Sequence, residues 1–230
     1  MPSAATSRLT AGPDGWWWLR GWGGAWCAAG IGDRRVEPGR LPASPPIART
    51  VSAEQVHGGS VAMMRASALQ RVAGCDALLT NVPGLGLLVR TADCLPIVFA
   101  DPVHQVVGLA HAGWRGLLAR LPARVVAAFR HWYHSRPEEL RVAIGPAIRA
   151  CCYEVGVEFR ARFGRFVTER RGRRTCDLAG AAVDQLQHCG VSASRILDTR
   201  RCTACEPTWW SLRRDGAAAG RMTSLVMVRP

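Results

Sequence analysis

The sequence contains no lysine, so all 30 of its basic residues are arginines, and with 17 acidic residues its formal net charge is +13. A positive balance of this size can indicate an anionic ligand or nucleic acid. The densest arginine run, residues 160–174, has only phenylalanines as aromatic neighbours (Phe159, Phe163, Phe166), and no helix-turn-helix, RNA-recognition or zinc-finger motif accompanies it. We attribute the charge to codons biased toward arginine and predict solvated surface, with no nucleic-acid partner.

Long apolar runs are also missing. No segment approaches the roughly 18 consecutive apolar residues of a transmembrane helix, and the first 15 residues contain no apolar core of signal-peptide length. The nine cysteines are an odd number and follow no regular framework, which favours free thiols in a reducing compartment over a disulfide scaffold. We therefore expect a cytoplasmic protein with no membrane partner.

The 230 residues lack internal repeats and a clear interdomain linker, and we expect one domain spanning residues 1–230 with a shortened, irregular N-terminal segment, residues 1–50. Short β-type segments alternate with helical ones in the rest of the chain. Their mixture predicts an α+β or layered α/β fold with helices on the outside. The expected strands are Leu85–Arg90, Ile97–Ala100, Val106–Ala110, Arg141–Ile144 and Thr223–Val228, and the expected helices are Leu117–Tyr133 and Leu178–Cys189, the second capped by Asp177 and ended by Gly190.

The most informative spacing joins Cys94 in the segment TADCLP to His111 in HAGWRG. Two β-rich runs around a proline-containing turn separate them and predict an antiparallel hairpin. If Ala100 pairs with Gln105, Cys94 lies directly opposite His111, with Cβ atoms about 4.5–5.5 Å apart. A thiol beside an imidazole is either part of a metal site or a nucleophile with its base.

A third reactive segment, QVHG at residues 55–58, supplies His57. Catalytic zinc takes three protein ligands from histidine, cysteine or carboxylate and keeps one position open, and His57, Cys94 and His111 would form such a set. The segment Gly113–Gly116 opens the expected helix, and Arg115 adds donors that suit an anion such as phosphate. We give little weight to the C-x-x-C pair Cys202/Cys205, since no second such pair exists, or to the vicinal Cys151-Cys152.

These motifs together resemble the YfiH-like laccase-domain family, also called multicopper polyphenol oxidase-like proteins. The matching segments appear in order over roughly residues 50–230: QVHG (55–58), CDAL (75–78), TADCLPI (91–97), HAGWRG (111–116), IGPAI with CYEVG (144–156), RCT (201–203), and SLRRD with GRM (211–222). The N-terminal Arg-x-Gly-Gly-Val-Ser element typical of the family is only approximated, at residues 20–26.

The resemblance implies a layered αββα sandwich and a mononuclear zinc bound by His57, Cys94 and His111. It also implies purine nucleoside chemistry, namely phosphorolysis of adenosine, inosine and methylthioadenosine and deamination of adenosine, with a nucleoside and phosphate as the small-molecule partners. Copper fits less well, because a laccase needs many histidines and the chain has six. The sequence leaves the oligomeric state open.

For catalysis we expect Cys94 and His111 at the centre, with Asp76 and Asp93 as candidates for proton transfer, although Asp93 is equally a candidate for a structural hydrogen-bond acceptor. The candidates for binding phosphate or ribose are Arg115, Arg213 and Arg214.

Two rival hypotheses remain. In the first, the protein is a metal-free cysteine hydrolase that acts on an amide, such as one in a peptidoglycan precursor, with Cys94 as nucleophile and His111 as base. In the second, it is a binding protein whose catalytic site has decayed.

Overall fold

The computed structural model describes residues 8–65 and 70–230, which form two large β-sheets stacked face to face and a small two-stranded one. The first sheet has the strand order β1-β2-β3-β15-β8-β4-β6. Its strands are β1 (Arg8–Ala11), β2 (Trp16–Arg20), β3 (Cys27–Gly32), β4 (Arg49–Ala53), β6 (Arg71–Val72), β8 (Leu85–Thr91) and β15 (Met222–Val228).

The second sheet has the order β14-β11-β9-β10-β7-β5 and mixes parallel and antiparallel pairs. Its strands are β5 (Val61–Met64), β7 (Ala77–Thr80), β9 (Leu95–Asp101), β10 (Val106–Ala112), β11 (Arg141–Ile144) and β14 (Ile196–Asp198). The small sheet pairs β12 (Val167–Arg170) with β13 (Arg173–Cys176).

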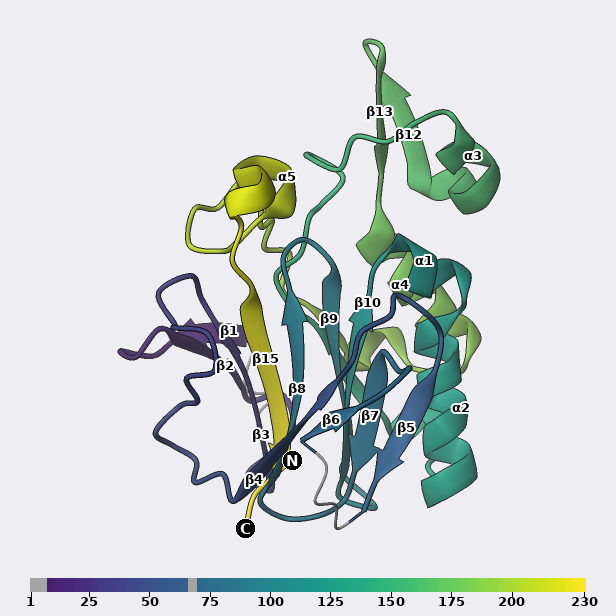
Figure 1. Cartoon of the computed structure of the whole chain (residues 1–230). Helices are drawn as coiled ribbons and strands as arrows, with labels where there is room; N and C mark the ends of the chain where they lie inside the picture. Colours follow the sequence, from purple (N-terminus) through teal and green to yellow (C-terminus); the bar gives the residue numbers. More distant parts are fainter. Residues whose placement is uncertain (1–7, 66–69) are drawn as a thin grey trace.

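Five α-helices accompany the sheets in the described part of the chain: α1 (Trp114–Leu118), α2 (Leu121–Tyr133), α3 (Glu158–Phe163), α4 (Leu178–His188) and α5 (Leu212–Asp215). Helices α1 and α2 pack on the second sheet, and α4 packs against both of them (Figure 1). The observed arrangement of mixed sheets with few helices confirms the α+β class. The longest helix has 13 residues, and none in the described residues is long and apolar enough to cross a membrane.

The central hairpin, β9 with β10, is buried along its whole length on both faces. One face contributes Val98 and Leu109 to an apolar core between the two sheets, and the other contributes Phe99 to a core beneath the helices. A strand covered on both sides needs apolar residues at nearly every position. This requirement explains the unbroken apolar runs that mark the hairpin in the sequence.

The hairpin is confirmed, but its predicted register is wrong by two residues. Val106 pairs with Asp101, so His111 lies opposite Pro96 and Cys94 lies level with Gly113. The buried carboxylate of Asp101 sets the turn, since it accepts hydrogen bonds from the backbone N–H groups of Val103 and His104 and from the His104 ring. The turn therefore spans residues 102–105, one position later in the chain than the predicted pairing of Ala100 with Gln105 places it, with the same four residues between the paired strands.

Other predicted helices and strands agree with the structure in some places and differ from it in others. The Asp177 carboxylate caps α4 by accepting from the Gly180 N–H, and Gly190 follows the helix with φ +95°, as expected. The predicted helix over residues 117–133 is instead two helices, because Arg120 adopts the left-handed conformation with φ 57°. Residues 8–32, expected to be irregular, form three strands of the first sheet.

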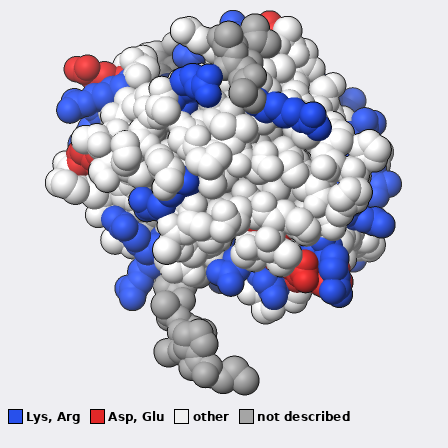
Figure 2. Space-filling model, turned by 90° about the horizontal axis from the view of Figure 1, so that it is seen from below, with Lys and Arg blue, Asp and Glu red and all other residues white. Residues whose placement is uncertain are grey.

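The arginines lie on the surface. On the face seen from below in Figure 2, they are spread around the rim and separated by uncharged residues. The dense run at residues 160–174 falls on α3 and the exposed β12–β13 hairpin, which agrees with the predicted solvated surface.

Candidate active site

A pocket of about 380 Å³ lies where loops from both sheets meet, at the end of the β9–β10 hairpin that leads to α1. This volume is in the usual range for small-molecule sites. Its lining combines polar and apolar side chains: His57, Ala92, Asp93, Cys94, Gly113, Trp114, Arg115, Ile148, Tyr153, Leu212 and Arg213. Five of these residues were predicted for the site: His57 and Cys94 as metal ligands, and Asp93, Arg115 and Arg213 in other roles. The third predicted ligand, His111, is buried and does not line the pocket.

Asp76 is the buried anchor of the site. It stands just before β7 and opposite His111, whose backbone N–H donates to the Asp76 carbonyl at 2.8 Å. The Asp76 carboxylate then accepts from the His111 Nδ1 at 2.9 Å and from the backbone N–H groups of His57 and Gly58 at 2.9 and 2.7 Å. One carboxylate therefore fixes the ring of one histidine and the backbone of the other.

The hydrogen bond to Asp76 also determines which His111 nitrogen is available. With Nδ1 donating to the carboxylate, the acceptor left on the ring is Nε2. A carboxylate behind a histidine is the usual arrangement for a metal ligand or a general base. Asp76 does not line the pocket, so the geometry fits a positioning role better than the proton transfer predicted for it.

His57 and Cys94 complete the group from separate segments. His57 belongs to the loop after β4 and has a left-handed backbone, with φ 59°, while Cys94 ends the loop between β8 and β9. The His57 and His111 rings meet edge to face with centroids 4.7 Å apart. Glycine at position 113 makes room for them, because a Cβ there would stand 2.9 Å from the Cys94 Sγ and 3.4 Å from the His57 Nδ1.

The electrostatics of the three side chains favour a thiolate. Burial raises the pKa of Cys94, but hydrogen bonds and charge interactions with His111 and His57 outweigh it and lower the pKa to about 7. Burial lowers the pKa of His111, while Asp76 and Cys94 favour its protonated form and raise the value to about 9. Without a metal, the site therefore favours a thiolate beside an imidazolium.

The donor set fits a zinc ion. One ligand atom from each of His57, Cys94 and His111 lies within 4.8 Å of the others. Two imidazoles and one thiolate are ligands that zinc accepts, and the pocket in front of them leaves a position open for a substrate or water. The ring-to-carboxylate bond of His111 supplies the outer partner that metal-binding histidines usually have.

Asp93 has a structural part in this site. Its Oδ1 accepts from the Thr203 hydroxyl at 2.6 Å and its Oδ2 from the Arg213 backbone N–H at 2.7 Å. The residue also has φ 86°, a strained value outside glycine. These contacts hold the loop that carries Cys94 and match the acceptor role named as the alternative to proton transfer.

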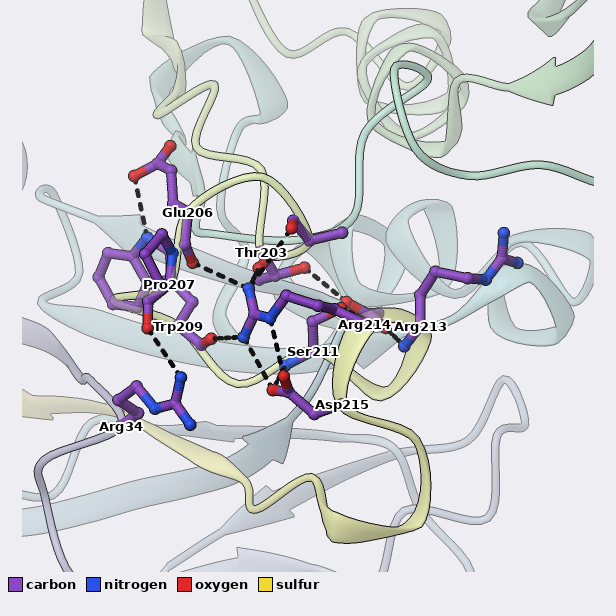
Figure 3. Close-up of polar contacts among 11 residues, drawn as sticks. Arg34, Thr203, Glu206, Pro207, Trp209, Ser211, Arg213, Arg214 and Asp215 are labelled. Carbon is purple, nitrogen blue, oxygen red and sulfur yellow. Dashed lines mark hydrogen bonds and ion pairs between the residues drawn. The ribbon is translucent and has the colours of Figure 1, made fainter.

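The two predicted arginines of α5 differ in direction. Arg214 lies outside the pocket lining: its guanidinium donates to carbonyl oxygens of Thr203, Glu206 and Trp209 and forms an ion pair with Asp215 (Figure 3). Its donors are already occupied, so we do not assign it a substrate. Arg213 does line the pocket and extends away from this network in Figure 3. Two of its five N–H groups donate to the carbonyl oxygens of Cys152 and Glu154, at 3.2 and 3.0 Å, which leaves the others for a ligand.

Arg115 lines the pocket beside Trp114, with its guanidinium 4.6 Å from the Trp114 ring centroid. The predicted anion site at the start of a long helix is weaker than expected, because α1 has five residues and its N-cap, Gly113, provides no side-chain cap. The Arg115 side chain itself is the available positive group.

Several lining residues escaped the prediction. Ile148, Tyr153 and Leu212 contribute apolar lining, and the Trp114 ring packs against that of Phe159 at a tilt of 57° with ring centroids 5.5 Å apart. They occupy loops and short helices that sequence periodicity does not reveal. The two cysteine pairs that we discounted separately come together in one cluster of four residues: Cys151, Cys152, Cys202 and Cys205.

The fold and the site together define a two-sheet α+β protein with a Cys–His–His donor set in a small-molecule pocket. A family model described as multi-copper polyphenol oxidoreductase laccase matches residues 40–229, and the chain belongs to this family, as its motifs predict.

Relatives with curated names share much of the chain. A purine nucleoside phosphorylase of Deinococcus radiodurans is 39% identical over 177 residues, covering 75% of this chain and 67% of the relative. A protein named adenosine deaminase RL5, from an unknown prokaryotic organism, is 35% identical over 158 residues, 64% of this chain and 60% of its own length.

Solved structures support the fold. The crystal structure of YlmD from Geobacillus stearothermophilus matches with a TM-score of 0.88 at 28% identity, covering 97% of this chain and 100% of that one. The curated YlmD protein of this organism, named a purine nucleoside phosphorylase, is 35% identical over 206 residues, covering 79% of this chain and 73% of the relative.

Proposed function

We propose that the protein is a zinc-dependent purine nucleoside enzyme of the cytoplasm that catalyses phosphorolysis of adenosine, inosine and methylthioadenosine and deaminates adenosine. The observation that carries the proposal is the convergence of His57, Cys94 and the buried His111 beside an open pocket that the first two residues line. Relatives named purine nucleoside phosphorylase and adenosine deaminase support the choice of substrate.

In this proposal the three residues hold the metal, and zinc supplies a Lewis acid that activates a nucleophile at neutral pH. Asp76 keeps His111 in the tautomer whose Nε2 is free to bind the ion. The same carboxylate holds the His57 loop through two backbone bonds. The ligands therefore need little reorganisation to bind the ion.

The rest of the pocket suits a nucleoside and phosphate. Trp114, Tyr153 and Leu212 offer flat or apolar surface to a purine. Arg115 and Arg213 bring positive charge to the same cavity and are the groups that we assign to phosphate or ribose. When the pocket binds the nucleoside and phosphate side by side, they lose less entropy on reaching the transition state than two free molecules would.

Zinc is preferred to copper on the donor set. A laccase needs several coppers and many histidines, but only His57 and His111 of the six histidines contribute to a metal-type cluster in the described residues. The word copper in the family description is therefore no guide to the metal here.

A second candidate function rests on the lowered pKa of Cys94. A thiolate beside His111, which is in turn held by Asp76, has the arrangement of a nucleophile, base and orienting carboxylate. Such a site would hydrolyse an amide without metal, as in a peptidoglycan precursor. His57 distinguishes the two functions, because a metal site needs it as a ligand and the cysteine mechanism does not.

The proposal is tested by incubating the purified protein with inosine and analysing the products. We expect hypoxanthine and ribose 1-phosphate only when phosphate is present, loss of both after chelator treatment, and recovery on adding zinc. With adenosine, inosine should also form without phosphate. Full activity in chelator-treated protein would contradict the zinc mechanism, and absence of any purine product from zinc-loaded protein would contradict the substrate.

A further inference from the structure

The cluster of four cysteines lies apart from the residues that hold the proposed catalytic metal. Cys151 and Cys152 belong to a turn after β11, and Cys202 and Cys205 to a turn after β14. The Sγ of Cys151 is 3.5 Å from those of Cys202 and Cys205, and the Sγ atoms of Cys152 and Cys205 are 3.3 Å apart. All four sulfurs lie within 4.8 Å of one another.

These distances are close to those of a tetrahedral thiolate site. Zinc binds sulfur at about 2.3 Å, so the sulfurs of a regular tetrahedron are about 3.8 Å apart. None of the four thiols forms a disulfide, because a disulfide would need two sulfurs about 2.05 Å apart. The cluster therefore needs only small side-chain adjustments to surround one ion.

The backbone holds both turns in place independently of any ligand. Ala147 forms a parallel bridge with Cys202: its N–H donates to the Arg201 carbonyl at 3.2 Å, and its carbonyl accepts from the Thr203 N–H at 3.1 Å. Below this bridge, β11 and β14 run parallel in the second sheet. The two cysteine pairs, about 50 residues apart in sequence, are thus brought together by the fold itself.

Arginine side chains surround the same two turns. The Arg213 guanidinium donates to the Cys152 carbonyl at 3.2 Å, and that of Arg214 donates to the carbonyl of Thr203, between the other two cysteines, at 2.7 Å. Arg149 donates through Nε to the Arg201 carbonyl at 3.2 Å. Four thiolates around one divalent cation have two net negative charges, which these guanidinium groups would partly offset.

We propose that Cys151, Cys152, Cys202 and Cys205 bind one structural Zn²⁺, separate from the pocket metal and independent of its chemistry. Thiolates select soft or borderline ions, and four of them leave no position open for a substrate. The pair at 202 and 205 has the usual C-x-x-C spacing of zinc sites, whereas the adjacent pair at 151 and 152 departs from it.

The position of the cluster suggests what such an ion would stabilise. Tyr153 directly follows Cys152 and lines the pocket, while Thr203 donates its hydroxyl to Asp93, next to Cys94. Arg213, which also lines the pocket, donates to the Cys152 carbonyl and lies over the Tyr153 ring, with its guanidinium carbon 5.3 Å from the ring centroid. Zinc in the cluster would join these wall segments without touching the substrate.

The test measures zinc per chain in the full protein and in four single variants, two of them within the cluster. Cys151→Ser and Cys205→Ser replace exposed thiols, so neither should prevent folding. We expect each to lose one zinc per chain and to unfold at a lower temperature, while His57→Ala loses the other zinc and keeps this one. Cys189→Ser, a half-buried cysteine outside both groups, should keep the zinc content of the parent.

A second readout uses Co²⁺ alone on His57→Ala protein freed of zinc. One equivalent should produce the intense sulfur-to-cobalt bands of a tetrahedral thiolate site, and Cys205→Ser in the same background should lose them. Unchanged zinc content in both serine variants would overturn the proposal. Disulfides within the cluster in protein purified without reductant, together with no cobalt bands after reduction, would also overturn it.

Discussion

We expect His57→Ala to lose the pocket metal and all purine nucleoside activity together. His57 is one of three protein donors, which is the number that catalytic zinc sites use. The two that remain, Cys94 and His111, are too few to hold the ion stably. The side chain is exposed, so removing it should leave the apolar cores intact. Activity should fall to background while the protein keeps its fold.

The measurement is zinc per chain and phosphate-dependent release of hypoxanthine from inosine, compared with the parent. His104→Ala is the matched control, because His104 is bonded to a carboxylate in the turn of the β9–β10 hairpin, at the end far from His111, and lies outside both candidate metal groups. It should keep the metal and the activity. If His57→Ala loses the metal yet still hydrolyses an amide substrate through Cys94, the cysteine hydrolase is the better account.

The second large effect is expected from Asp76→Asn. The carboxylate accepts three hydrogen bonds, from the His111 ring and from the N–H groups of His57 and Gly58. The amide oxygen of the variant side chain can still accept some of these bonds. The NH₂ group that replaces the other carboxylate oxygen would face a donor instead of an acceptor. Loss of an outer carboxylate of this kind lowers metal affinity or activity by about 10- to 100-fold.

Metal affinity is measured by competition with a chromophoric chelator, and folding by thermal unfolding. The matched control is Asp101→Asn, which removes a carboxylate that is equally buried and also bonded to one imidazole and two backbone N–H groups. Both substitutions should reduce stability, by about 1–3 kcal/mol for a donor left unpaired. Only Asp76→Asn should weaken zinc, and equal zinc affinity in the two variants would refute the positioning role.

The sequence predicts the hairpin because its strands are buried on both faces and their apolar runs are unbroken. It does not predict the register, which depends on three hydrogen bonds that the Asp101 carboxylate accepts within the turn. A two-residue shift keeps each side chain on its face, so Cys94 and His111 remain neighbours although they are not directly opposed. The predicted pair of Cys94 and His111 is therefore present in the fold, although the register from which it was predicted is wrong by two residues.

Other parts of the site depend on contacts between distant segments. The directions of Arg213 and Arg214 could not be read from adjacent positions on one short helix, since carbonyl groups of the Cys202–Cys205 turn and Asp215 determine where Arg214 points. The four-cysteine cluster was missed for the same reason. Each pair looks incidental alone, and the pairing of β11 with β14 together with the bridge between Ala147 and Cys202 brings them together.

Locating the metal tests the central claim most directly. X-ray diffraction from crystals of the zinc-loaded protein, collected on both sides of the zinc absorption edge, shows where zinc scatters. We predict an anomalous peak within bonding distance of His57, Cys94 and His111, and its absence from crystals of His57→Ala. A map with no peak beside these three residues, in protein that nonetheless converts inosine, would contradict the account.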